Sequence, residues 1–126
     1  MDRIEIKCVN DGSRFLFFDR NKDGWTTEIN GNGITAKLKV SDYIANPSEF
    51  FSEIAGQWRG WEGIKSYQSL EGELMIQATH DKKGAVLLTV ILSPNDGTDD
   101  WKLQHCFNLE LGQLERISQE MKAFFK

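Results

Sequence analysis

The sequence predicts an α+β domain in which two helices pack on a mostly antiparallel sheet of about seven to eight strands. Three observations lead to this prediction. Eight short segments have the alternation or the apolar run of β-strands, and turn residues separate them. Two further segments repeat apolar residues at three- and four-residue spacing, as amphipathic helices do. Their order, a four-strand meander, a helix, four strands and a C-terminal helix, is typical of an α+β fold.

The first forty residues are expected to form the meander. The first strand alternates apolar Ile4, Ile6 and Cys8 with charged neighbours, which is the period of a half-buried strand. The strongest turn signal in the chain is the run from Asn30 to Gly33. The four strands are expected at Arg3 to Val9, Arg14 to Phe18, Trp25 to Ile29 and Ile34 to Val40.

The first helix is expected to begin at Asn46. This residue suits the N-cap, Pro47 suits the first helical position, and Glu49 stands at capping-box spacing. Glycines then weaken and end the helix, so the chain from Trp58 to Gly63 is expected to leave it through a tight corner. The apolar stripe of the helix consists of Phe50, Phe51, Ile54, Ala55 and Trp58.

The second half is expected to repeat this plan. The segment Ala85 to Leu92 is apolar on both faces and is therefore expected to be a central strand. The segment Gly112 to Phe125 has one apolar face and is expected to form the C-terminal helix. The strands are expected at Ile64 to Leu70, Leu74 to Thr79, Ala85 to Leu92 and Trp101 to Leu109.

Composition favours one soluble domain spanning residues 1–126. With 15 basic and 19 acidic residues the net charge is -4, which argues against nucleic acid as a partner. No secretory signal is recognisable, and no apolar run approaches the ~20 residues that cross a membrane. A cytoplasmic protein is therefore expected. Cys8 and Cys106 are expected to be reduced thiols in or near the core, with a disulfide between them left open.

One motif suggests calcium. The run Asp19-Arg20-Asn21-Lys22-Asp23-Gly24 fits the opening of an EF-hand loop. The twelfth position is Asn30 instead of a bidentate glutamate, and Trp25 to Glu28 continues as a strand. A hairpin turn is therefore favoured, because Asp, Asn and Gly are also the residues that tight turns select. Calcium binding stays open as the alternative.

No catalytic constellation, metal site or cofactor is expected. His105 lies on the apolar side of its strand and is expected to be a hydrogen-bonded core or edge residue, whereas His80 is expected in a solvated turn. Cys106 follows His105 directly, and neighbouring side chains of a strand point to opposite faces, so the two cannot form a catalytic dyad. The chain is therefore expected not to be an enzyme.

Two segments are candidates for binding a partner. The first is the corner with Trp58, Arg59, Trp61 and Glu62, which forms either a structural cap on the edge of the core or an exposed aromatic and arginine patch. The second is an acidic loop, which either stays solvated beside an edge strand or presents negative charge to a basic partner. Its residues are Asp96, Asp99 and Asp100.

Several motifs of residues 46–126 together resemble a family of small single-domain bacterial proteins of unknown function. They are Phe50-Phe51, Gln57 to Gly63, Ser69 to Gly72, Ala78 to Asp81 with Gly84, Leu111 to Glu115 and Phe124-Phe125. Proteins of this size and layout are often encoded beside polymorphic toxins as immunity proteins. The resemblance therefore implies a cytoplasmic inhibitor, and it carries over no catalytic residue.

The leading expectation is thus an immunity protein that binds a toxin domain encoded nearby and blocks it. The alternative is a small-ligand or carbohydrate-binding module, or an enzyme of low activity, with Trp58 and Trp61 flanking a pocket. Either a monomer or a homodimer is compatible with the sequence, since uncovered edge strands can pair across a two-fold axis.

Overall fold

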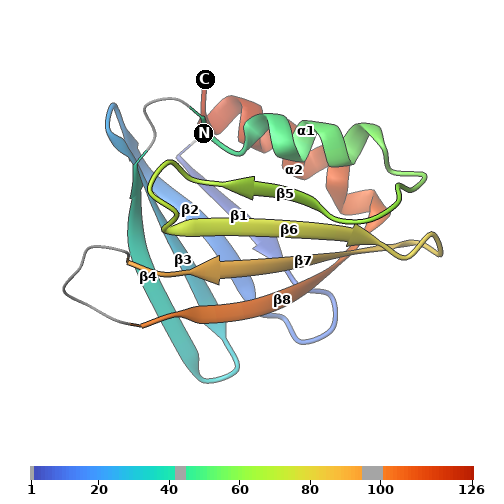
Figure 1. Ribbon diagram of the computed structural model, residues 1–126, viewed down its shortest axis with the longest axis horizontal. Helices are drawn as coiled ribbons and strands as arrows, with labels where there is room; N and C mark the ends of the chain where they lie inside the picture. Colours follow the sequence, from blue (N-terminus) through green and yellow to red (C-terminus); the bar gives the residue numbers. More distant parts are fainter. Residues whose placement is uncertain (1, 42–44, 95–100) are drawn as a thin grey trace.

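The expected strands and helices are present in the computed structural model of the chain, which describes residues 2–41, 45–94 and 101–126. These residues form two helices and eight strands in an α+β fold, and each strand pairs antiparallel with its neighbour in sequence. The strands divide into two four-stranded sheets, β1-β2-β3-β4 and β5-β6-β7-β8. Figure 1 shows the two sheets crossing, with both helices along one side.

The first sheet is the predicted meander. Its hairpin between β2 and β3 extends further than predicted, with Asn21 opposite Gly24 and a bulge after Phe18. The first strand is shorter than predicted, because the N–H of Val9 turns away and donates to the Asn108 carbonyl of the second sheet at 2.9 Å. The strands are β1 (Arg3–Lys7), β2 (Arg14–Asn21), β3 (Gly24–Gly31) and β4 (Ile34–Ser41).

The second sheet has the predicted central strand β7 between β6 and β8. The first of its strands is shorter at both ends than predicted, because Gly63 has a φ of 77° before it and a turn begins at Ser69 after it. The strands are β5 (Lys65–Gln68), β6 (Leu74–His80), β7 (Ala85–Leu92) and β8 (Leu103–Glu110).

Both helices begin close to their predicted positions. Helix α1 (Ser48–Gly56) starts after Pro47, and Asn46 accepts the Ser48 N–H at 2.9 Å, so Asn46 helps the start from one position before the N-cap. Helix α2 (Leu111–Phe124) starts directly from β8, where Glu110 and Gln113 form a capping box. Trp58 lies beyond the end of α1 and does not extend its apolar stripe.

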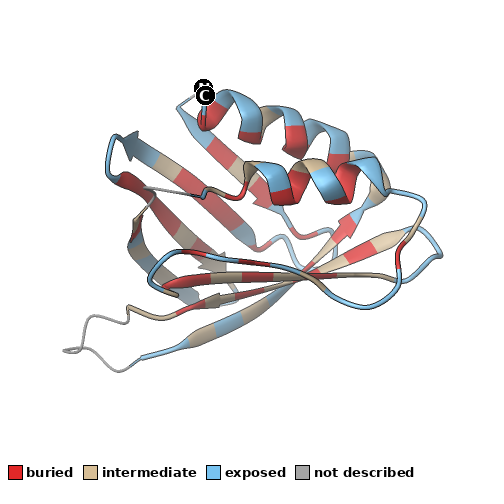
Figure 2. Ribbon diagram, turned by 45° about the horizontal axis from the view of Figure 1, so that its top comes forward, coloured by how far each residue is buried: buried red, intermediate tan, exposed pale blue. Residues whose placement is uncertain are grey.

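The core lies between the inner faces of the sheets and the buried sides of the helices (Figure 2). Aromatic rings from β2, β3 and α2 meet around Phe17, whose centroid lies 4.8 to 6.4 Å from those of four neighbours, Phe15, Trp25, Phe124 and Phe125. The end of β4 is tied to the turn before β6 by the buried carboxylate of Glu73, which accepts the Ser69 hydroxyl and, at 3.3 Å, the Ser41 N–H.

Candidate interaction surfaces

The corner after α1 places one tryptophan outside the core and one inside. Trp58 is 48% exposed, and the Arg59 guanidinium carbon lies 5.1 Å from the centroid of its ring, within cation–π range. Trp61 is only 7% exposed, although it stands three residues later. The exposed-patch interpretation therefore describes Trp58 and Arg59, and the core-edge interpretation describes Trp61.

His80 of β6 holds this corner in place. Its Nε2 donates to the Trp58 carbonyl at 2.7 Å, and its Nδ1 accepts the Lys82 N–H at 2.7 Å. These bonds assign the neutral tautomer with its hydrogen on Nε2. Both ring nitrogens are thus occupied. The expectation of a solvated turn residue is corrected in part: His80 is the last residue of β6, is half-buried, and packs edge-on against Trp61, with ring centroids 5.2 Å apart. A ring bonded in this way is not available as a general base.

Gly60 allows the close approach of the corner to the turn between β6 and β7. Its φ is 137°, and a Cβ there would stand 3.2 Å from Lys82 Cγ and 3.7 Å from the His80 ring. The Lys82 amine reaches back to Glu62, and this hydrogen bond, with the attraction between the charges, lowers the pKa of the Glu62 carboxyl. Glu62 itself is fully in solvent, so the pair adds little to stability.

Lys65 and Glu53 complete the corner from the other side. The Lys65 amine lies 5.8 Å from the Trp61 ring centroid and 3.1 Å from Glu53 Oε1 on α1. Trp61 therefore lies between Lys65 of β5 and His80 of β6. The acidic residues of the second candidate, Asp96, Asp99 and Asp100, lie outside the described residues.

The two sheets differ sharply in the charge of their outer faces. On the first sheet, every strand has at least one charged side chain on its outward side. These side chains form cross-strand pairs: Arg14 Nη1 lies 3.3 Å from Glu5 Oε1, and Glu28 stands opposite Lys37. The charged residues of this face are Arg3, Glu5 and Lys7 of β1, Arg14 of β2, Glu28 of β3, and Lys37 and Lys39 of β4, and the uncharged Leu16, Phe18, Thr26, Asn30 and Thr35 lie among them.

The outer face of the second sheet has no such charges. Among the outward residues of its four strands, the charged one is Glu110. It lies at the extreme end of β8, where it caps α2. We call the remainder the uncharged face. It consists of Ser66 and Gln68 of β5, Met75, Gln77 and Thr79 of β6, Ala85, Leu87, Thr89 and Ile91 of β7, and Gln104, Cys106 and Asn108 of β8.

The cysteines are free and lie on opposite sides of the second sheet. Cys8 is in the core, where its sulfur accepts the Asn108 N–H at 3.3 Å. Cys106 is exposed on the uncharged face, which corrects the expectation of a core or near-core thiol. The alternation of β8 is as predicted, since His105 points inward and Cys106 outward.

A polar cluster joins the two sheets around His105. Its Nε2 lies 3.0 Å from the buried Ser13 hydroxyl, which donates in turn to Asp11 Oδ1 at 2.7 Å. The carboxylate also accepts the Ser13 N–H and the Asn32 amide. Asp11 Oδ2 lies 3.9 Å from the same Nε2. Serine and carboxylate therefore approach one ring nitrogen, whereas in a hydrolase triad they bind opposite nitrogens of the histidine. The expectation of a hydrogen-bonded edge histidine is confirmed.

Asp11 is expected to make the stability of the protein sensitive to acid. The Ser13 hydroxyl, the Ser13 N–H and the Asn32 amide hold the pKa of Asp11 well below its ordinary value of about 4. Stability from these bonds is therefore complete above the pKa of the unfolded chain and is lost as the pH falls toward the folded-state pKa.

The measurement is the unfolding temperature at pH 7 and pH 3 for the native chain and Asp11→Asn. The variant is expected to be less stable at pH 7 and to lose less on acidification. An equal loss in both proteins would show that Asp11 carries no acid sensitivity.

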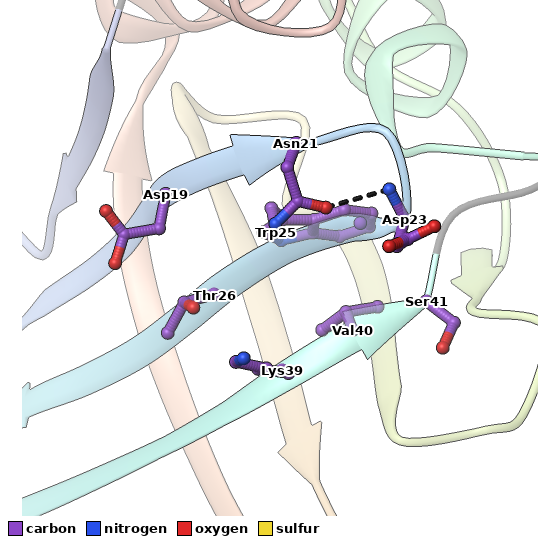
Figure 3. A pocket seen from close by; sticks show the side chains of 9 residues that line it. Asp19, Asn21, Asp23, Trp25, Thr26, Lys39, Val40 and Ser41 are labelled. Carbon is purple, nitrogen blue, oxygen red and sulfur yellow. Dashed lines mark hydrogen bonds between the residues drawn. The ribbon is translucent and has the colours of Figure 1, made fainter.

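The calcium-like run forms the hairpin turn between β2 and β3, as predicted. Asp19 adopts a φ of 52°, and Asn21 Oδ1 is committed to the Asp23 N–H at 2.8 Å. Figure 3 shows these side chains around a hollow of about 390 Å³, which Lys39 also lines. The positive charge of Lys39, which lines the hollow, disfavours binding of a cation there. Within the described ranges no three His, Cys, Asp or Glu side chains are grouped to hold a metal ion.

Comparison with known protein families gives a match over most of the chain. A family model described as "Family of unknown function (DUF6228)" covers residues 10–126. No curated protein and no solved structure matches the chain. Among the described helices, neither is long and apolar enough to span a membrane.

Proposed function

We propose that this chain, which belongs to the family of unknown function DUF6228, is a non-enzymatic binding protein whose partner is another protein. The observation that carries the proposal is the exposed Trp58, stacked by Arg59 on a corner that His80 fixes from behind. Tryptophan and arginine are the residues most enriched where protein interfaces concentrate their binding energy.

The rigidity of the corner supports this proposal. Binding costs free energy when mobile side chains and loops become ordered, and a surface held before binding avoids part of that cost. The backbone of Trp58 is bonded to His80, and its ring is already covered on one side by Arg59. Trp58 is 48% exposed, so much of its surface is available to a partner. Glu62 and Lys82 stand near as a charged pair that can favour a partner of matching polarity.

The class of partner follows from the resemblance. Similarity to immunity proteins favours a toxin domain encoded nearby, which this chain binds and inhibits in the cytoplasm. The net charge of -4 favours a basic toxin surface, because opposite fields speed the encounter of two proteins. Asp96, Asp99 and Asp100 are proposed as a second contact region on the same electrostatic ground.

The alternative of a sugar or small-ligand module finds less support. It requires Trp58 and Trp61 to flank one pocket, and Trp61 is buried against His80. Such an enzyme would use His80 or a carboxylate as its base, and His80 has both ring nitrogens in hydrogen bonds to the backbone.

Co-expression tests the proposal in the cell. The chain is produced together with the product of its neighbouring gene, and host survival and co-purification are scored in the same culture. We expect the host to survive and the two proteins to purify as a complex. Death of the host and absence of a complex, with the chain soluble and folded, would reject the proposal.

A further inference from the structure

We propose that the uncharged face binds a second copy of this chain, so that two second sheets pack face to face in a symmetric dimer. This inference is independent of the proposed function, because Trp58 and Arg59 lie at the corner after α1 and are not part of that face. The occupant is inferred from the charge pattern of the two sheets, from the symmetry of self-association and from the area of the face.

The charge pattern distinguishes the uncharged face from the rest of the surface. Charged residues make up 27% of the chain, and the first sheet carries them on the outward side of every strand. The second sheet has the same number of strands, yet its outward residues are amides, hydroxyls, a thiol and the apolar Met75, Ala85, Leu87 and Ile91. Depletion of charge at the centre is the compositional mark of an interface.

The edge of the face is charged. A hollow of about 300 Å³ at one end is lined by Met75 and Ile91 together with Glu71 and Lys102. At the other end lies Glu110. An uncharged centre with charged residues at its border is the usual anatomy of a protein interface.

The symmetry of a dimer is the reason that the composition of the uncharged face suits a second copy of this chain. In a two-fold dimer each residue near the axis meets its own copy, so a charge there would face a like charge. The copies also repel one another at a distance, since each carries -4. A face without charge at its centre avoids the first penalty, and hydroxyl and amide side chains can donate to and accept from their own copies.

The area of the face fits a weak but real dimer. Four strands spaced about 4.8 Å apart and about seven residues long give a flat area of roughly 450 Å² per copy. Two copies therefore bury about 900 Å² if the face is treated as flat, and uneven side chains add to this area. The value is near the ~1,000 Å² at which biological interfaces begin. We accordingly expect a dissociation constant in the micromolar range.

Thr89 marks the centre of the contact. It stands on β7 opposite Gln77 on one side and Cys106 on the other, and its hydroxyl lies 3.6 Å from the Cys106 sulfur. Substitution of Thr89 therefore tests the dimer with the least effect on the borders of the face. Cys106, exposed in the free chain, provides a chemical probe at the same place.

Sedimentation velocity from about 1 to 300 μM, a range that brackets micromolar association, measures the dimer directly. The native chain is expected to shift from monomer to dimer, and Thr89→Lys to dimerise at least about tenfold more weakly. Thr35→Lys is the matched control, because Thr35 is exposed on the outer face of β4. If Thr89→Lys does not fold, Gln104→Lys at an exposed position of β8 replaces it.

Alkylation of Cys106 by N-ethylmaleimide provides the second measurement. The rate is expected to fall several-fold as the native chain is concentrated and to stay constant for Thr89→Lys. A monomer at the highest concentration, or equal association of Thr89→Lys and the native chain, would overturn the proposal. Protection of Cys106 only when the neighbouring gene product is added would also overturn it, by assigning the face to that partner.

Discussion

Replacing Phe17 by alanine is expected to lower the free energy of unfolding by about 3–5 kcal/mol. Phe17 is fully buried and contacts aromatic rings from β2, β3 and α2, so its loss leaves a cavity where the first sheet meets the C-terminal helix. The four surrounding rings are held by β2, β3 and the C-terminal end of α2, so they can fill this space only in part. Urea unfolding followed by circular dichroism gives the change.

Phe18 is the matched control for Phe17. It is the next residue of β2, points to the opposite side, and is only half-buried beneath the Arg3 guanidinium, 6.0 Å from its ring centroid. Phe18→Ala is expected to cost clearly less than Phe17→Ala. Equal losses for the two variants would mean that the inner aromatic cluster is not the centre of the core.

Replacing Trp58 by alanine is expected to weaken binding to the protein partner by at least about 2 kcal/mol, which is roughly a 30-fold rise in the dissociation constant. The substitution removes the exposed ring and its stacking with Arg59. It leaves the bond from His80 intact, because that bond is made to the backbone carbonyl. The corner therefore keeps its shape, and surface plasmon resonance reports the loss of contact alone.

Two further variants make this prediction specific. Ile34→Ala removes an apolar side chain of similar exposure from the first sheet and is expected to leave affinity unchanged. Arg59→Ala removes the stacking cation and is expected to cost less than Trp58→Ala. A Trp58→Ala variant that binds as tightly as the native chain would exclude the corner as the binding surface.

The elements of the fold could be predicted from the sequence because periodicity and turn residues are local signals. The alternation of Ile4, Ile6 and Cys8 and the apolar run of Ala85 to Leu92 both led to strands that are present. The division into two sheets was not predicted. It depends on contacts between distant segments, such as the bonds from Glu73 and from Val9, for which a local pattern gives no signal.

The candidate surfaces could be predicted only in part. Trp58 and Trp61 are the same residue type in one short corner, and their difference in burial comes from the position of His80 on β6. The cluster of Asp11, Ser13 and His105 was missed because its members are up to 94 positions apart in the chain. The uncharged face did leave a signal, since the positions of β6 to β8 that alternate with the apolar ones lack charge apart from Glu110 at the end of β8.

Titration calorimetry between the purified chain and the purified product of its neighbouring gene tests the central claim, binding of a protein partner, most directly. The account predicts saturable binding by the native chain and at least about 30-fold weaker binding by Trp58→Ala. No detectable binding by the native chain, together with a raised unfolding temperature in the presence of a sugar or another small ligand, would contradict it.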